Sequence, residues 1–284
     1  MSNPVFNNSA VFGDPRQQRR GGQQTVQAPA WGAQAADAAT LEQMYEAPTA
    51  TTRETGRLTY DDVIVKTGGL LTLLVVVAAA TWTLAPGLWV VGMIVGLVLG
   101  LVNAFKRKPS PALIVAYTVA EGVFLGGISY LFQNVVVPAG SGSTVSAQPI
   151  VLQAVLATVA TFGASLWLYR SGRVRVTAKS VRFLLIAMIG YAVFSLLNIV
   201  LMFVLPNSGM FGPLRGGWVG VLVGLFAVGL AAFSLIVDFD AIKRGVEQGA
   251  PKTFAWTAAF GLIVTLVWLY LEFLRLFAIF SSSD

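Results

Sequence analysis

The chain has 284 residues, of which 56% are hydrophobic and 11% charged, and its mean hydropathy is +0.73. This composition is typical of an integral membrane protein. The sequence contains no histidine and no cysteine, which excludes disulfides, thiolate or imidazole metal sites, and catalysis by a cysteine nucleophile or a histidine base. Any chemistry must therefore use carboxylates, hydroxyls, amines or backbone carbonyls.

The net charge of +6 is a second global feature, and it could in principle indicate a nucleic-acid partner. Most lysines and arginines, however, lie in an amino-terminal segment or in short loops beside hydrophobic stretches. Charges in these places are typical of a topology signal in a membrane protein. We therefore expect a lipid bilayer as the partner and no nucleic acid; the sequence indicates no particular protein partner.

Residues 1–62 differ in composition from the rest of the chain, being rich in Gln, Ala, Asn, Gly, Thr and Pro. Such a segment cannot bury enough apolar surface to fold alone, so we expect a disordered cytoplasmic tail. Its first residues, Met1 to Asn8, lack the basic start and apolar stretch of a cleaved signal peptide, so the tail is expected to stay attached.

Residues 63–284 read as one membrane domain, because they contain seven apolar runs of about 20 residues, the length that crosses ~30 Å of hydrocarbon as a helix. We therefore predict an all-α integral membrane protein with seven transmembrane helices. The predicted spans are Val63–Leu84, Leu88–Phe105, Ala112–Phe132, Ile150–Tyr169, Val181–Leu205, Trp218–Val237 and Phe254–Phe280.

The loops between the predicted spans alternate in charge. Those after the first and third spans carry no Lys or Arg, and the loop after the fifth has only Arg215. By the positive-inside rule, the amino terminus is then cytoplasmic and the carboxyl terminus lies outside a cell inner (plasma) membrane. The basic loops hold Lys106, Arg107 and Lys108 after the second span, Arg170, Arg173, Arg175, Lys179 and Arg182 after the fourth, and Lys243, Arg244 and Lys252 after the sixth.

Small residues recur at helix-packing spacing in two spans. They are Gly92, Gly96 and Gly100 in the second span, and Gly220 and Gly224 in the sixth. Glycines at this spacing let two helix backbones approach closely. We assign these positions to helix packing and to no chemistry.

Four carboxylates, Glu121, Asp238, Asp240 and Glu272, lie in or at the ends of the apolar spans. An ionisable group in this position is expensive to insert and is by default a functional-site hypothesis. Carboxylate oxygens suit a hard cation such as calcium, and protons compete with cations for the same oxygens. Glu121, Asp238 and Glu272 are therefore candidate transient sites for calcium or protons, as transported ions and not as bound cofactors.

The same carboxylates could instead have a purely structural role, in which they bind no transported ion. Glu121 could be protonated and bonded to a neighbouring helix. Asp240 could pair with Lys243, and Glu272 with Arg275, because residues three apart on a helix are neighbours. Residues two apart point in different directions, so only one of Asp238 and Asp240 can face a pore, and we favour Asp238.

The chain resembles a bacterial member of the Bax inhibitor family, the transmembrane BAX inhibitor motif proteins, over about Tyr60 to Asp284. The stretches that carry the resemblance are Ala116–Gly122 continuing to Ser129, Asp238–Lys243, and Leu269–Asp284. The resemblance implies a seventh helix wrapped by six others. It also implies a pH-sensitive calcium leak controlled by two aspartates on the sixth and seventh helices.

Asp238 matches the sixth-helix aspartate of that pair, followed by the spacing Asp-x-x-x-Ile-Lys. The expected position of the seventh-helix aspartate holds Thr265, and Glu272 lies two turns farther along a similar face. This departure indicates a divergent member of the family. Lys106 or Arg107 falls where relatives carry a basic residue able to pair with the sixth-helix acid, so Asp238, Asp240, Lys106 and Arg107 are the expected gating residues.

We therefore predict a pH-sensitive cation (calcium) leak channel or transporter, gated by protonation of membrane-embedded carboxylates. The alternative is a non-transporting interaction or stress-regulatory protein whose buried acids tie helices together. An enzyme is not expected: an intramembrane aspartyl protease needs an aspartate on each of two facing helices, and the seventh span offers only Glu272.

Overall fold

A computed structural model describes residues 56–106, 108–136, 149–205 and 211–281 of the chain, all within one compact unit, Thr51–Asp284. These residues form seven long helices and no strand, and every one of the seven is long and apolar enough to cross a membrane. The predicted all-α membrane fold is therefore confirmed. The helices are α3 (Tyr60–Leu84), α4 (Trp89–Phe105), α5 (Pro111–Leu131), α6 (Ile150–Arg170), α7 (Ala178–Val204), α8 (Gly217–Glu247) and α9 (Phe254–Ser281), with short turns η1 (Pro86–Leu88) and η2 (Phe132–Val136).

Helix boundaries agree with the predicted spans to within about three residues, with one exception. Helix α8 continues past Val237 to Glu247, because its polar end is held by ion pairs one turn apart, Asp240 with Arg244 and Lys243 with Glu247. Apolar length alone predicts only the part of a helix that faces lipid. Asp238 and Asp240 consequently lie inside a helix and not at its end.

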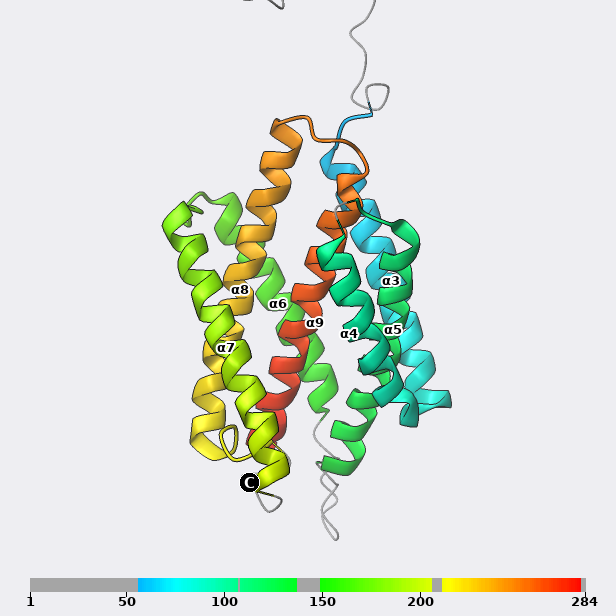
Figure 1. Ribbon diagram of the computed structural model, residues 1–284, viewed down its shortest axis with the longest axis vertical. Coiled ribbons are helices and arrows are strands. Elements are labelled where there is room, and N and C mark those ends of the chain that lie inside the picture. The colour runs from blue at the N-terminus through cyan, green and yellow to red at the C-terminus, as the bar shows by residue number, and fades with distance from the viewer. Residues whose placement is uncertain (1–55, 107, 137–148, 206–210, 282–284) are drawn as a thin grey trace, which may run out of the picture. The chain divides into compact units, whose positions relative to one another are not determined.

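Helix α9 is the most buried of the seven. In its most apolar stretch of 18 residues, 67% of the residues are buried, compared with 11% in the corresponding stretches of α4 and α7. It packs closely against α3, α5, α6 and α8, and Figure 1 shows it between the labels of α3–α5 and those of α6–α8. That all six helices wrap around α9 stays a prediction.

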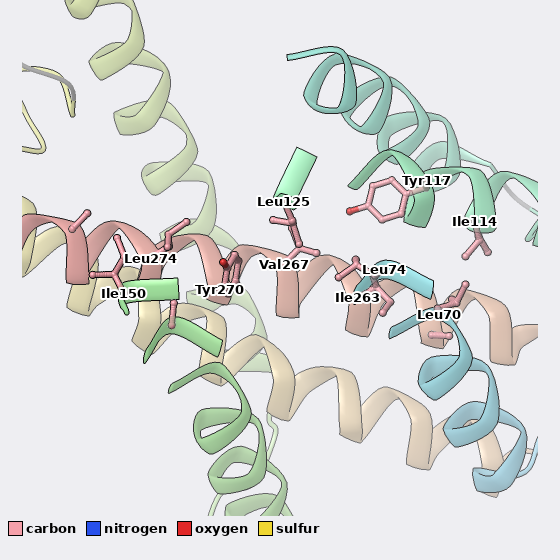
Figure 2. Close-up of a cluster of buried hydrophobic side chains, with 13 residues drawn as sticks. Leu70, Leu74, Ile114, Tyr117, Leu125, Ile150, Ile263, Val267, Tyr270 and Leu274 are labelled. Carbon is pink, nitrogen blue, oxygen red and sulfur yellow. The ribbon is translucent and has the colours of Figure 1, made fainter. Parts of the chain in front are cut away.

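One face of α9 forms the main hydrophobic core. Residues at helical spacing on this face meet side chains from α3, α5 and α6, as Figure 2 shows. Such a face, repeating every third or fourth residue, is what a helix needs to pack against several neighbours at once. The labelled members are Ile263, Val267, Tyr270 and Leu274 on α9, Leu70 and Leu74 on α3, Ile114, Tyr117 and Leu125 on α5, and Ile150 on α6.

The glycines predicted to pack helices do so. A side-chain Cβ placed on Gly92 would lie 2.5 Å from the backbone nitrogen of Phe124, and one on Gly100 would lie 3.3 Å from the ring of Tyr117. Gly224 similarly faces Leu276 across the α8–α9 contact. Close approach of α4 to α5, and of α8 to α9, therefore depends on the absence of a side chain.

Gly126 on α5 gives a sharp test of this packing. A Cβ at this position would overlap the carbonyl oxygen of Ala78 and lie 2.9 Å from Cβ of Thr81, so α3 would have to move. We expect Gly126→Ala to destabilise the protein by about 1–3 kcal/mol, the usual effect of overpacking. The measurement is the apparent unfolding temperature in detergent. Gly163→Ala is the matched control, because nothing lies within 4 Å of its Cβ, and an equal loss there would contradict the packing role.

The residues just before α3 lie against the loop that joins α8 to α9. The Leu58 amide donates to the Ala250 carbonyl at 2.7 Å, and the Lys252 amide donates to the Gly56 carbonyl at 2.9 Å. Lys252 also forms an ion pair with Asp62 at 3.2 Å, and Leu58 is 2% exposed. The predicted boundary between tail and membrane domain, 62/63, thus falls inside α3. Residues 1–55 of the predicted tail lie outside the described residues.

Candidate functional site

Asp238 on α8 faces Thr265 on α9. The Thr265 hydroxyl donates a hydrogen bond to Oδ2 of Asp238 at 2.9 Å, and lies 3.1 Å from the carbonyl oxygen of Gly261. Thr265 is buried and Asp238 is half-buried. Gly261, one turn before Thr265, lies next to the other carboxylate oxygen, since a Cβ on it would be in ordinary contact with Oδ1, at 3.9 Å. The position implied for the second aspartate of the pair is therefore opposite Asp238, but it carries a hydroxyl.

Lys106, one of the two basic partners expected for Asp238, does not pair with it. The described residues form four ion pairs, and none includes Asp238 or Lys106. Lys106 is exposed at the end of α4, and Arg107 lies outside the described residues. The gating pair of Asp238 with Lys106 is thus not formed in this structure, where Thr265 is the polar partner of Asp238.

Asp240 belongs to the polar end of α8. Its Oδ2 pairs with Arg244 at 2.9 Å, and its Oδ1 accepts a hydrogen bond from the Tyr169 hydroxyl at 3.4 Å. The predicted partner, Lys243, pairs with Glu247 instead, at 3.8 Å. The ion-pair interpretation of Asp240 therefore holds with a different partner. Asp240 pairs with Arg244, four residues later on the helix, and not with Lys243, three residues later.

Glu121 lies between α5 and α4. Its side chain accepts a hydrogen bond from Tyr117, one turn earlier on α5. A Cβ on Gly96 of α4 would lie 2.9 Å from Oε1 of Glu121, so the glycine makes space for the carboxylate. Tyr117 also packs edge-to-face against Phe260 of α9, with ring centroids 5.0 Å apart. Glu121 thus sits in a small polar site of its own, held by a tyrosine.

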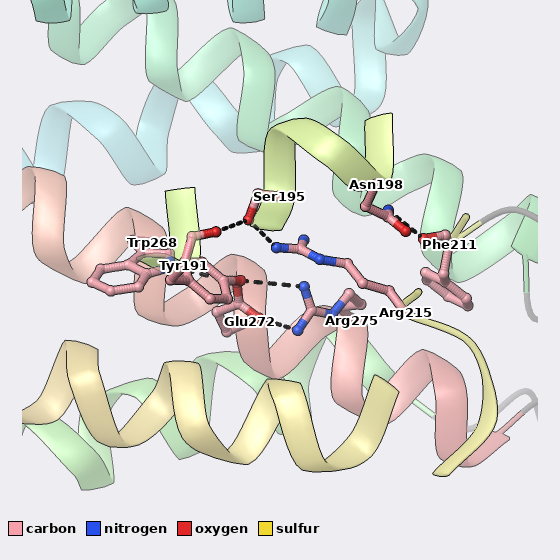
Figure 3. Close-up of polar contacts among 8 residues, drawn as sticks. All are labelled: Tyr191, Ser195, Asn198, Phe211, Arg215, Trp268, Glu272 and Arg275. Atoms are coloured by element: carbon pink, nitrogen blue, oxygen red, sulfur yellow. Dashed lines mark hydrogen bonds and ion pairs between the residues drawn. The ribbon is translucent and has the colours of Figure 1, made fainter. Parts of the chain in front are cut away.

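Glu272 is buried in a polar network between α9 and α7, drawn in Figure 3. One carboxylate oxygen pairs with Arg275 at 2.5 Å. The other accepts hydrogen bonds from the Tyr191 hydroxyl and, at 3.4 Å, from the Trp268 indole. Because both oxygens have partners and the charge is balanced by a buried arginine, this arrangement fits the salt-bridge interpretation of Glu272.

A second arginine, missed by the sequence reasoning, joins this network from the loop before α8. The Arg215 guanidinium stacks over the ring of Tyr191, at 5.1 Å from its centroid, and donates to the Ser195 hydroxyl (Figure 3). Asn198 fixes the same loop by bonding the Phe211 carbonyl at 2.9 Å and the Leu214 amide at 3.0 Å. The available signal was that Arg215 is alone in an otherwise uncharged loop.

The three candidate ion-binding carboxylates therefore occupy three separate places. Glu121 lies between α4 and α5, Asp238 between α8 and α9, and Glu272 between α7 and α9. Among the described residues no three acidic side chains come together as metal ligands. Of the three, Asp238 accepts its hydrogen bond from a hydroxyl on a facing helix, and carboxylate, hydroxyl and carbonyl oxygens are the ligands that a hard cation takes.

Comparison with curated proteins finds no match to this chain. Comparison with protein families does: the family model described as Bax inhibitor 1 like matches residues 3–282, nearly the whole chain. The match agrees with the seven membrane-crossing helices and with the sequence stretches on α5, α8 and α9 that carried the resemblance. This chain belongs to the Bax inhibitor 1-like family of membrane proteins.

Proposed function

We propose that this protein lets cations, calcium among them, cross its membrane, and that the protonation state of Asp238 gates their passage. Membership of the Bax inhibitor 1-like family supports a membrane role, and the family resemblance implies a calcium leak. Calcium and protons are the transported ions in this proposal. It includes neither an enzymatic activity nor a bound cofactor.

The observation that carries the proposal is that Asp238 bonds the neutral hydroxyl of Thr265 and belongs to none of the ion pairs among the described residues. A carboxylate among apolar helices without a charge partner lowers the stability of the fold. Such a residue is therefore by default a functional-site hypothesis. Glu272, in contrast, is held by an ion pair with Arg275 and a hydrogen bond from Tyr191. Asp238 and Glu121 are thus the two candidate acids whose negative charge no described ion pair balances, and of these Asp238 is the one that matches the sixth-helix aspartate implied by the family resemblance.

Protons and calcium would then compete for the carboxylate of Asp238. An ionised Asp238 attracts the cation and accepts from Thr265. A protonated Asp238 is neutral, so it no longer attracts a cation, and it can keep the hydrogen bond to Thr265 as the donor. We therefore expect calcium flux to decrease as the pH falls through the range in which Asp238 takes up a proton.

Calcium flux through the full-length chain in proteoliposomes, followed with an entrapped calcium indicator, tests the proposal. We expect flux above that of protein-free liposomes, with a reversible decrease on acidification. The control is the same protein with the pH varied on one side at a time, which shows from which side Asp238 is reached. Flux no greater than that of protein-free liposomes at any pH would overturn the proposal.

For orientation, we propose that the basic loops face the cytoplasm of a bacterial plasma membrane. The loops that follow α4, α6 and α8, and the start of α3, lie at one end of the helices (Figure 1). The basic residues of these loops make that end the cytoplasmic one under the positive-inside rule. Asp238 then lies on the cytoplasmic half of α8, and Glu272 on the outer half of α9.

A second candidate function is a non-transporting scaffold, favoured by the network around Glu272. Its acid, two arginines and a tyrosine join α7, α9 and the loop before α8, which is what a helix tie requires. Background-level calcium flux together with a strong dependence of stability on Glu272 would favour this function over ion passage.

A further inference from the structure

An apolar groove of about 540 Å³ runs between α3 and α6. These two helices form its walls and are not among the closely packed helix pairs, while α5 and α9 form its floor. Figure 2 shows three of the floor residues, Leu125 of α5 and Val267 and Tyr270 of α9, near one another. The volume lies within the ~300–1,000 Å³ typical of sites that hold small apolar molecules.

The groove lies at membrane depth and opens toward lipid. Its wall residues come from the second half of α3 and the first half of α6, both inside spans that cross the membrane. Wall side chains stay open on the outer side: Val75 is 60% exposed and Val159 is 62% exposed. Hydrocarbon is therefore the medium that meets the groove.

The hydroxyl groups that line the groove are already bonded within the protein. Ser129 and Tyr270 share a hydrogen bond of 2.6 Å on the floor. Thr158 donates to the Ala154 carbonyl at 2.7 Å, and Thr83 donates to carbonyls of its own helix. Each of these hydroxyls already takes part in a hydrogen bond within the protein, and apart from them and the Trp82 indole the lining side chains are hydrocarbon, so the groove favours an apolar occupant.

We propose that this groove is a binding site for one acyl chain of a bilayer phospholipid. Lipid tails are as apolar as the groove, so the preference comes from shape: a chain lying along a concave surface contacts more protein atoms than one on a convex helix. The volume of 540 Å³ is little more than one turn of a helix ~10 Å across with a pitch of about 5.4 Å, so a helix from a second copy would lie over the groove without filling it, whereas an acyl chain fits inside. This site is independent of the proposed ion passage.

The test uses the full-length protein in nanodiscs with phosphatidylcholine whose acyl chain carries a photoreactive diazirine. Adducts are mapped by mass spectrometry at Val159 in the groove and at Ile189 on α7. Their exposed fractions are nearly equal, 62% and 64%, so exposure alone predicts equal labelling. We expect labelling at Val159 to exceed that at Ile189 several-fold, and one phospholipid to remain bound after detergent extraction.

A groove-filling variant provides the second measurement. Ala79→Phe should lower labelling at Val159 several-fold and leave Ile189 unchanged, because Ala79 lines the groove. Ala80→Phe, an exposed neighbour on α3 that does not line the groove, is the matched control.

Three results would overturn the acyl-chain assignment. The first is equal labelling of Val159 and Ile189 in the wild-type protein. This measurement does not depend on the folding of any variant. The second is groove labelling by a diazirine fatty acid but not by the phospholipid, which would indicate a free fatty acid. The third is weak groove labelling that rises when the protein is diluted in lipid, which would indicate a second copy of the chain in the groove.

Discussion

An Asp238→Asn variant is expected to lose about nine-tenths or more of the calcium flux of the wild type, and to lose most of its dependence on pH. Asparagine keeps the size of the side chain and can still bond Thr265, but it removes the negative charge. A unit charge about 4 Å away contributes roughly 4 kcal/mol at an effective dielectric constant of 20, and each 1.4 kcal/mol is about tenfold. Calcium flux in proteoliposomes across pH is the measurement.

Asp240→Asn is the matched control for this prediction. It makes the same chemical change two residues along the same helix, at a carboxylate whose charge Arg244 already balances at 2.9 Å. We expect its flux to stay within about twofold of the wild type, the size of a partly exposed ion pair's contribution. If Asp238→Asn and Asp240→Asn carry equal calcium at every pH, Asp238 is not the gate.

Glu272→Gln is expected to destabilise the folded protein by about 3–5 kcal/mol, whatever its effect on flux. The substitution leaves Arg275 as a charge without its partner at 7% exposure, and breaking a buried ion pair from one side has this magnitude. The measurement is unfolding in detergent, by heat and by denaturant. Glu272→Gln combined with Arg275→Met should recover most of the loss, because no fully buried charge is then left alone and the remaining cation, Arg215, is only half-buried.

The exposed pair of Lys243 and Glu247 supplies the control for the Glu272 prediction. Their side chains are 52% and 59% exposed, so Lys243→Gln should change the free energy of unfolding by no more than about 1 kcal/mol. A Glu272→Gln protein as stable as the Lys243→Gln protein would show that the network in Figure 3 does not tie the helices.

The sequence alone determined the number of membrane-crossing helices and most of their ends. Hydropathy and length are properties of a continuous stretch, so they need no knowledge of neighbouring helices. The same reasoning failed at the end of α8, where ion pairs between exposed side chains accompany the continuation of the helix to Glu247. It also identified the glycines of α4 as packing residues, because their spacing places them on one helix face.

Tertiary structure decided the partner of each carboxylate. Asp238 meets Thr265 on α9, Glu121 faces Gly96 on α4, and Glu272 meets Tyr191 on α7 as well as its near neighbour Arg275. Local spacing could anticipate only contacts within one helix, such as that of Glu272 with Arg275. Contacts between helices depend on how each helix is rotated about its axis, and that rotation is fixed by the packing of all seven together.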